Sequence, residues 1–217
     1  MGGWNRTNKL GDHFERRRSQ ALAIGGVPQL CDHEGMTLRV FGNEPSSVFA
    51  LLGKDENSVT FAMGWTLEQS IAFRELFISE LLGRSVKIAD GVDVDLQRHV
   101  EGGGFTDIEL VRKNVCHLII EAKRGWAIPS KQQLEKYARR LERSADGRCL
   151  IVSLSAATTR YASRHLPLRI GKVPVTHRSW ADVWHLTDAA HRKASGFEEK
   201  LWLRHLSWHL KDYVSMQ

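Results

Sequence analysis

The sequence predicts an α/β protein in which a central mixed sheet is flanked by helices. A long helical pattern comes before several strand patterns, a second helical pattern follows them, and a short buried strand comes next. The order of the core elements is therefore α-β-β-β-α-β, and further helical patterns continue to the end of the chain.

Length and charge limit the function classes. The 217 residues suit one compact domain with an extension. The net charge is +6 (31 − 25) and favours contact with polyanions. No run of about 18 uncharged apolar residues occurs, so no membrane partner is expected. The three cysteines are widely spaced without a C-x-x-C motif, so neither a disulfide framework nor a zinc ribbon is expected, and a cytoplasmic location fits.

Three parts are expected along the chain. Residues 1–35 hold glycine pairs, a basic run and little periodicity, which is typical of a poorly ordered or loosely packed extension. Residues 36–175 would form the α/β core, and residues 176–217 a C-terminal helical segment. The last helical pattern reaches the end of the chain without a stop signal, as expected for a piece of a longer protein.

The first long helical pattern ends at Gly83. Asp55 or Ser58 would cap its start, and Thr66 or Ser70 would cap a second helix within it. Strands are expected before and after this helical region, over residues 36–41, 86–88 and 92–100.

A hairpin follows. Phe105–Val111 alternates in character, residues 112–114 form a polar turn, and Val115–Lys123 is rich in β-branched and apolar residues. Because strand side chains alternate, Glu121 and Lys123 project to the same face.

The turn length predicts the register of this hairpin. A three-residue turn would place Val111 opposite Val115 and Asp107 opposite Ile119. Asp107 would then lie diagonally from Glu121, at roughly 7–8 Å between backbones. Two carboxylates at that separation can share a divalent cation.

The second helical pattern starts at Ser130, after Pro129. Pro174 lacks an N–H donor, so the strand that contains it is expected at a sheet edge. The remaining patterns predict a buried strand, a helix, this edge strand and two amphipathic helices: Cys149–Leu154, Thr158–His165, Val173–His177, Trp180–Ala194 and Phe197–Val214.

Asp107, followed by Glu121-x-Lys123 at the end of the next strand, resembles the signature of the PD-(D/E)xK nuclease superfamily. The proline that usually precedes the aspartate is Thr106 here, which leaves the acid intact. The resemblance implies a restriction-endonuclease-like core.

Gln133 and Tyr137 extend this resemblance. Their spacing is similar to the Q-x-x-x-Y element of the RecB-type branch, and the resemblance covers about residues 55 to 155. Because the two residues are four apart, they lie on one face of the helix.

The resemblance implies a Mg²⁺-dependent nuclease that acts on DNA, with Mn²⁺ as a substitute metal. Asp107, Glu121 and the carbonyl of Ala122 would bind the metal. Lys123 would orient the attacking water and offset charge on the phosphate, and its two acidic neighbours should keep it protonated. Alone, the E-x-K sequence is more often a strand-end ion pair among surface residues.

A further acid is expected from the first helix. Glu56 is the first choice, as a catalytic residue and metal ligand, followed by Glu68 and Glu75. The alternative for Glu56 is a first-turn acid that only favours the helix dipole.

Each remaining candidate also has a structural alternative. Gln133 is a candidate catalytic residue, but with Ser130 it would also form a capping box. Tyr137 is a candidate substrate-binding residue that also lies on the apolar stripe. Arg124 and Lys131 are candidate phosphate contacts, and a solvated helix face is the alternative for Lys131.

Two other functions stay open on the sequence. One is a nucleic-acid-binding module of the same fold that does not cut. The other is a protein-interaction domain that uses the Trp-rich C-terminal helices, through which the chain could also form a homodimer. DNA is the expected partner and RNA stays open, as does a role in defence, restriction or repair.

Overall fold

Nearly all of the described chain belongs to one compact unit. The computed structural model describes residues 38–40, 42–87, 91–101, 104–144 and 147–216. Arg39–Gln217 forms one compact unit. The expected extension over residues 1–35 lies outside the described residues.

Six strands form one mixed sheet in the order β1-β2-β3-β4-β6-β5. The strands β1, β2 and β3 pair antiparallel, β3, β4 and β6 pair parallel, and β5 pairs antiparallel with β6. Their bounds are Asp93–Val100 (β1), Gly104–Arg112 (β2), Cys116–Ala122 (β3), Arg148–Ser155 (β4), Arg169–Ile170 (β5) and Val173–Ser179 (β6). The expected α/β class with a mixed sheet is confirmed.

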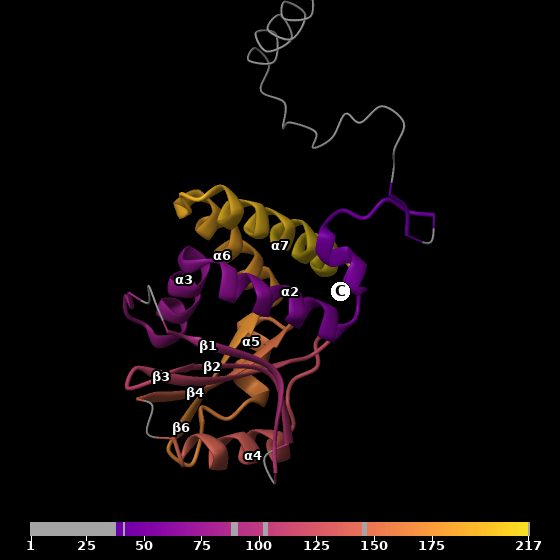
Figure 1. Cartoon of the computed structure of the whole chain (residues 1–217). Coiled ribbons are helices and arrows are strands. Elements are labelled where there is room, and N and C mark those ends of the chain that lie inside the picture. Colours follow the sequence, from indigo (N-terminus) through magenta and orange to yellow (C-terminus); the bar gives the residue numbers. More distant parts are fainter. Residues whose placement is uncertain (1–37, 41, 88–90, 102–103, 145–146, 217) are drawn as a thin grey trace, which may run out of the picture. The chain divides into compact units, whose positions relative to one another are not determined.

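Helices flank this sheet on both sides (Figure 1). Helices α2 and α3 lie along one face and α4 along the other, while α6 and α7 pack on α3 and α2. The helix bounds are Val48–Leu52 (η1, a 3-10 helix), Glu56–Gln69 (α2), Ile71–Leu82 (α3), Lys131–Leu141 (α4), Thr159–His165 (α5), Trp180–Lys193 (α6) and Phe197–Ser215 (α7). The order α3-β1-β2-β3-α4-β4 is the expected α-β-β-β-α-β.

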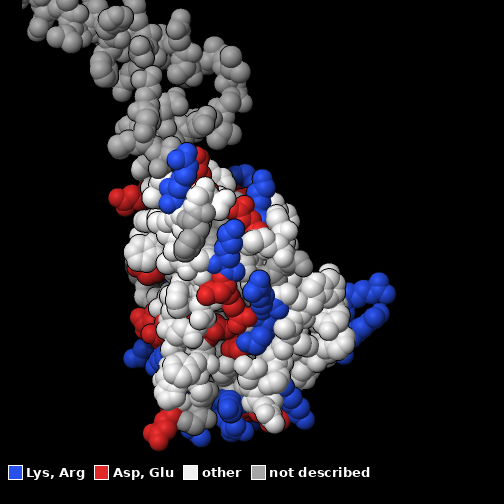
Figure 2. Space-filling model, turned by 90° about the vertical axis from the view of Figure 1, so that its right-hand side faces the viewer, with Lys and Arg blue, Asp and Glu red and all other residues white. Residues whose placement is uncertain are grey.

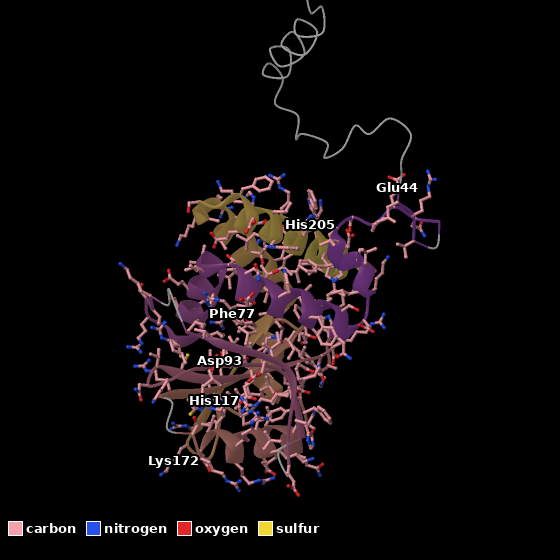
Figure 3. All side chains as sticks on the ribbon, viewed as in Figure 1. Glu44, Phe77, Asp93, His117, Lys172 and His205 are labelled. Carbon is pink, nitrogen blue, oxygen red and sulfur yellow. The ribbon has the colours of Figure 1, made fainter. Side chains whose placement is uncertain are left out.

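The sheet separates two apolar cores. The larger core joins Phe77 of α3 and Trp180 of α6 to one face of the sheet, with Ile108 and Ile120 from the central hairpin. The smaller core joins α4 to the other face around Ile119. Figure 3 shows Phe77 on the α3 side of the sheet and His117 toward α4.

Short polar side chains set the ends of the first helices. Asp55 caps α2 by accepting a hydrogen bond from the backbone N–H of Ser58 at 2.7 Å. Ser70 ends α2 and caps α3, because its hydroxyl accepts from the N–H of Phe73 at 3.1 Å. Gly83 stops α3 with φ 62°, a left-handed conformation that glycine adopts readily. The expected break at Ser70 is therefore present.

Two segments that were expected to form strands do not form them in the residues that the structure describes. Val86 and Lys87 lie in irregular backbone, and Ser79 bonds Val86 on both its N–H and its carbonyl, which gives these groups a side-chain partner in place of a strand. In the expected strand over 36–41, only residues 38–40 are described, and Val40 makes an isolated bridge with Asn43.

The strand with Pro174 is not at the edge of the sheet, contrary to the expectation. It is β6, and β5 pairs with it at Arg169↔Pro174 and Ile170↔Val173. Because β5 has only two residues, it covers only the first part of β6.

The C-terminal helices continue the core. The expected boundary at residue 175 falls within β6, and α6 begins directly after it at Trp180, whose side chain is fully buried. No helix in the described ranges is both long and apolar enough to span a membrane.

Candidate active site

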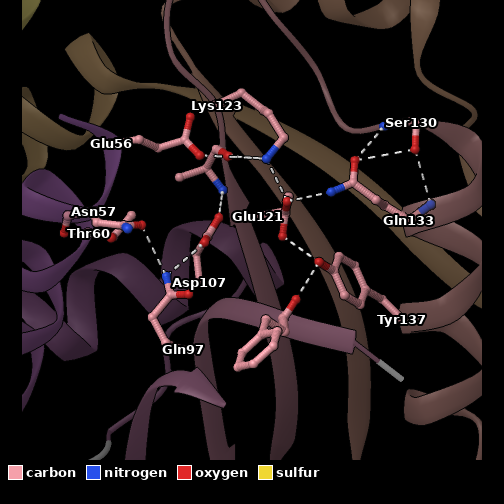
Figure 4. Close-up of polar contacts among 12 residues, drawn as sticks. Glu56, Asn57, Thr60, Gln97, Asp107, Glu121, Lys123, Ser130, Gln133 and Tyr137 are labelled. Atoms are coloured by element: carbon pink, nitrogen blue, oxygen red, sulfur yellow. Dashed lines mark hydrogen bonds and ion pairs between the residues drawn. The ribbon is translucent and has the colours of Figure 1, made fainter. Parts of the chain in front are cut away.

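Three elements bring acidic side chains to one end of the sheet. Glu121 stands near the end of β3, Asp107 lies on the neighbouring strand β2, and Glu56 opens α2. Figure 4 shows these carboxylates directed toward one another, with Lys123 among them. Figure 2 shows the side of the molecule at which α2 begins, where acidic side chains gather and Lys and Arg side chains stand directly beside them.

The register of the hairpin differs from the expected one by two residues. Val111 pairs with His117 and Glu109 with Ile119, so the expected pairs Val111–Val115 and Asp107–Ile119 are wrong. The turn lies one residue further along the chain than expected: the N–H of Val115 donates to the carbonyl of Arg112 at 3.0 Å. Asn114 adopts φ 62° within it, which asparagine tolerates better than most residues.

This register brings Asp107 and Glu121 closer than a diagonal pair. The backbone pairing of β2 with β3 ends at Ile108↔Ile120, so the next position on each strand is Asp107 and Glu121. There the Asp107 carboxylate replaces the backbone acceptor, taking a hydrogen bond from the N–H of Ala122 at 2.7 Å. This bond fixes Asp107 against the end of β3.

Lys123 connects the acids. Its ammonium donates to Glu121 Oε1 at 2.6 Å and to the carbonyl of Ala122 at 2.8 Å, and it lies 3.7 Å from Glu56 Oε1. The N–H of Lys123 bonds the carbonyl of Leu154 at 2.7 Å, so β4 holds this residue in place just after β3 ends.

Helix α4 supplies two further contacts to Glu121. Gln133 Nε2 donates to Oε1 at 2.9 Å, and the hydroxyl of Tyr137 lies 2.6 Å from Oε2. Tyr137 is also 2.8 Å from the carbonyl of Phe105, but its single proton favours the charged acceptor. Glu121 is 4% exposed, and these partners satisfy a carboxylate that would otherwise be costly to bury.

Gln133 both caps α4 and contacts Glu121. Ser130 and Gln133 form a capping box at the start of α4, with the N–H of Ser130 donating to Gln133 Oε1 at 3.1 Å. The amide group therefore caps the helix with its oxygen and contacts Glu121 with its nitrogen. The ring of Tyr137 is likewise buried, while its hydroxyl contacts Glu121.

No motif in the sequence points to Gln97 or Asn57 as a site residue. Gln97 on β1 donates from Nε2 to Asp107 Oδ1 at 3.0 Å and to Asn57 Oδ1 at 3.3 Å. Its backbone has φ 49°, a left-handed conformation rare in a strand. Asn57 thereby reaches the site through Gln97. The hydroxyl of Thr60 donates to the carbonyl of Asn57 at 2.9 Å.

The electrostatics reflect crowding of negative charge around one cation. Burial, and then the charge of Asp107, raise the pKa of Glu121. Burial also raises the pKa of Glu56, with Lys123 opposing and Asp107 adding to the effect. Burial alone would lower the pKa of Lys123, but the hydrogen bond and charge of Glu121, with Glu56 and Asp107, outweigh it and raise this pKa. Lys123 is thus a stable cation at neutral pH.

The oxygen donors suit a hard cation in type. The Ala122 N–H donates to Asp107, and Lys123 donates to both Glu121 and the carbonyl of Ala122, so these oxygen donors are neighbours. Mg²⁺ needs only one or two carboxylates beside water and phosphate. Within the described ranges, no three His, Cys, Asp or Glu side chains form a ready metal-ligand group. The residues therefore fit Mg²⁺ as a two-carboxylate site, with Glu56 further out.

The two expected phosphate contacts, Arg124 and Lys131, differ in their distance along the chain from Lys123. Arg124 is exposed in the loop after Lys123, and its backbone hydrogen-bonds the Glu56 carboxylate. The side chain of Lys131 is 80% exposed and lies 3.9 Å from Glu135 on its own helix. Of the lower-ranked acids, Glu68 lies about three turns along α2 from Glu56 and accepts a hydrogen bond from Gln69. Glu75 belongs to α3.

A buried charge network lies beside the site and was missed from the sequence. Glu109 is fully buried, and its carboxylate contacts His117 Nε2 at 2.5 Å, the guanidinium of Arg140 and Arg98 at 3.6 Å. Burial alone would raise the pKa of Glu109, but the hydrogen bond from His117 and the charges of Arg140 and Arg98 lower it. Arg140 therefore has an internal charged partner.

Comparison with known proteins found no matching protein family, no similar curated protein and no similar solved structure.

Proposed function

We propose that this chain is a Mg²⁺-dependent nuclease with a restriction-endonuclease-like core that hydrolyses phosphodiester bonds in DNA. The observation that carries the proposal is the convergence of Asp107, Glu121 and Lys123, at the ends of two paired strands, with Glu56 from α2 and Gln133 from α4. Glu56, Asp107 and Gln133 come from elements other than the one that carries Glu121. A chance surface ion pair needs none of these supporting contacts.

Asp107, Glu121 and the carbonyl of Ala122 would hold the metal, with Glu56 as an outer ligand and Mn²⁺ as a substitute for Mg²⁺. When bound, such a cation lowers the pKa of a water and neutralises charge that develops on the phosphate. Asp107 is suited to this role because the Ala122 N–H and Gln97 fix both of its oxygens.

Lys123 would act as a cation and not as a base. Its raised pKa keeps the ammonium protonated at neutral pH, so it can donate to a water or to a phosphate oxygen. Glu56 is the more exposed of the two glutamates beside Lys123, with 28% of its side chain accessible against 5% for Glu121. A raised pKa and access to solvent suit Glu56 for taking a proton from the attacking water.

Gln133 and Tyr137 would act through Glu121. Tyr137 is 3% exposed, and both side chains contact the Glu121 carboxylate. This supports positioning roles for the two residues, in place of the direct catalytic and substrate contacts implied by the resemblance. Arg124, exposed beside the acids, is the better candidate for a phosphate contact.

The test is incubation with linear duplex, circular duplex, single-stranded DNA and RNA in Mg²⁺, Mn²⁺, Ca²⁺ or chelator. We expect cutting in Mg²⁺ and Mn²⁺ but little in Ca²⁺, because Ca²⁺ accepts looser geometry and activates water less well. The Asp107→Asn and Glu121→Gln variants should not cut. Cutting that survives chelator, or that the double variant retains, would overturn the assignment at this site.

A second function, a nucleic-acid-binding module that does not cut, is favoured by one observation. The ammonium of Lys123 already satisfies the Glu121 and Ala122 oxygens that a metal would use. On this reading, the protein binds nucleic acid in chelator as well as in Mg²⁺ and leaves every substrate intact. Calorimetric titration with Mg²⁺ separates the two functions, because only the nuclease requires binding that depends on Asp107.

A further inference from the structure

Three aromatic rings form a continuous surface group beside the acids. Trp126 follows Lys123 by three residues, and its ring centroid lies 5.3 Å from that of Tyr161 in a T-shaped contact. Tyr161 in turn stacks on His165 at 4.2 Å with 26° between the ring planes. We refer to Trp126, Tyr161 and His165 as the aromatic platform.

The platform is anchored to the same strands as the site. Gly125, next to Trp126, accepts a hydrogen bond at 2.8 Å from the N–H of Ala156, just after β4. The carbonyl of Tyr161 accepts from His165 Nδ1 at 2.8 Å, which holds the imidazole over the phenol ring. The rings therefore keep a fixed place relative to Lys123.

The platform is also open to solvent. Trp126 is 51% exposed, and a T-shaped contact covers at most one face of its indole. A cavity of about 390 Å³ adjoins Trp126 and is lined also by Thr158, Ser179 and Asp182. An exposed indole beside a cavity offers a flat apolar face on which another ring can stack.

Positive charge runs alongside these rings. Arg160 and Arg164 are exposed and four residues apart on α5, as are Tyr161 and His165, so a cationic stripe and an aromatic stripe lie next to each other on one helix. Arg124 adds an exposed cation between the platform and Lys123 along the chain. Proteins bind single strands by combining aromatic rings, which stack on the bases, with cations, which contact the phosphates.

A second exposed pair lies on the other side of Glu121. Phe105, at the start of β2, is 61% exposed, and its ring centroid is 4.6 Å from that of His99 on β1. Phe105 and Asp107 share β2, which pairs with the Glu121 strand β3, while Trp126 follows the end of β3. Both aromatic groups therefore belong to the strands that carry the acids.

We infer that the aromatic platform stacks the bases of an unpaired nucleic-acid strand and so directs single-stranded segments to the acids. This inference rests on the proposed function for the site it serves, but stacking itself needs neither metal nor cleavage. In a duplex the base faces are already stacked on each other, so the platform can serve only unpaired nucleotides.

The test compares two fluorescent strands of equal length, an oligothymidylate and an abasic strand with the same phosphates, binding in chelator. We expect the wild-type protein to bind the oligothymidylate more tightly by about 5-fold to 150-fold for each stacked base, the equivalent of ~1–3 kcal/mol. Trp126→Ala should remove about one such factor and leave abasic binding unchanged. Trp126→Phe should keep most of the preference.

Trp65→Ala is the matched control, because Trp65 is 46% exposed on α2 and is not part of the platform. It should leave both affinities unchanged. Equal wild-type affinity for the two strands overturns the inference, as does a Trp126→Ala variant that loses both affinities together, since that marks a displaced loop. Base-dependent binding without cleavage would support the platform and refute the nuclease. Cleavage without base-dependent binding would support the nuclease and refute the platform.

Discussion

The ammonium of Lys123 lies 2.6 Å from a carboxylate oxygen of Glu121 and 2.8 Å from the carbonyl oxygen of Ala122. Two of the three oxygen donors proposed for Mg²⁺ thus already face a cation that belongs to the protein. A divalent ion that binds them must share these oxygens with Lys123 or displace its side chain, and this competition can be measured.

Replacing Lys123 with methionine should strengthen metal binding and abolish cleavage. Removing a unit positive charge beside a cation site lowers the repulsion that the metal meets, and we expect at least about a tenfold gain in affinity. Calorimetry with Mg²⁺ measures this gain. Lys123→Arg, which keeps the charge, is the control and should show a smaller change. Unchanged affinity in the methionine variant would mean that the metal binds elsewhere.

Asp107→Asn should abolish cleavage while it lowers the pKa of Glu121. The charge of Asp107 is one cause of that raised pKa, so its removal lets Glu121 ionise more readily. Because the folded protein raises the pKa of Glu121, the ionised carboxylate of this residue lowers the free energy of unfolding at neutral pH. The free energy of unfolding at neutral pH should therefore hold or rise in the variant.

Carboxyl NMR titration and urea unfolding measure the two effects of this change. Asp93→Asn, which replaces an exposed acid on β1, is the control and should alter neither quantity. A Glu121 pKa that does not move in Asp107→Asn would contradict the proximity of the two acids.

Glu109→Gln should destabilise the fold at neutral pH by about 3–5 kcal/mol, because it leaves Arg140 buried without its charged partner. The pKa of Glu109 is lowered in the folded state, so its contribution is present above the unfolded value of 4.5 and lost as the pH falls through the folded pKa. Urea midpoints should therefore fall less steeply with acidification in the variant than in the wild type. Parallel curves below pH 4.5 would refute this.

Replacing Arg124 and Lys131 together should flatten the salt dependence of duplex binding. Each phosphate contact contributes about −0.9 to the slope of log affinity against log salt, so the slope should change by about 1.8 if both side chains touch phosphates. Anisotropy in Ca²⁺ separates binding from cutting. Lys113→Ala, an exposed lysine in the turn at the far end of the hairpin, should not alter the slope.

Local signals predicted the elements around the site well. Helix caps such as Asp55, Ser70 and Ser130 act over three residues, so their pattern is visible in the sequence. The same holds for the alternation that places Glu121 and Lys123 together. These short-range rules place the candidate site residues on their helices and strands.

Register and long-range pairing could not be predicted in this way. The hairpin turn lies one residue further along than expected, with Asn114 in a left-handed conformation, and the strand register differs by two. The Glu109–Arg140 pair joins residues 31 positions apart, and Gln97 reaches Asp107 from a strand with an unusual backbone. Each of these contacts depends on how separate elements pack together, and a pattern within one element cannot predict that.

Gln133 links ligand binding at the carboxylates to the stability of the first turn of α4. The same amide group holds the first turn of α4 through Ser130 and holds Glu121 through its nitrogen. A ligand that draws Glu121 away would weaken the hold on this amide group, and a ligand that orders Glu121 would strengthen it. Hydrogen exchange at the backbone amides of Ser130 and Gln133 would therefore register occupancy of the site, even for a ligand that is never turned over.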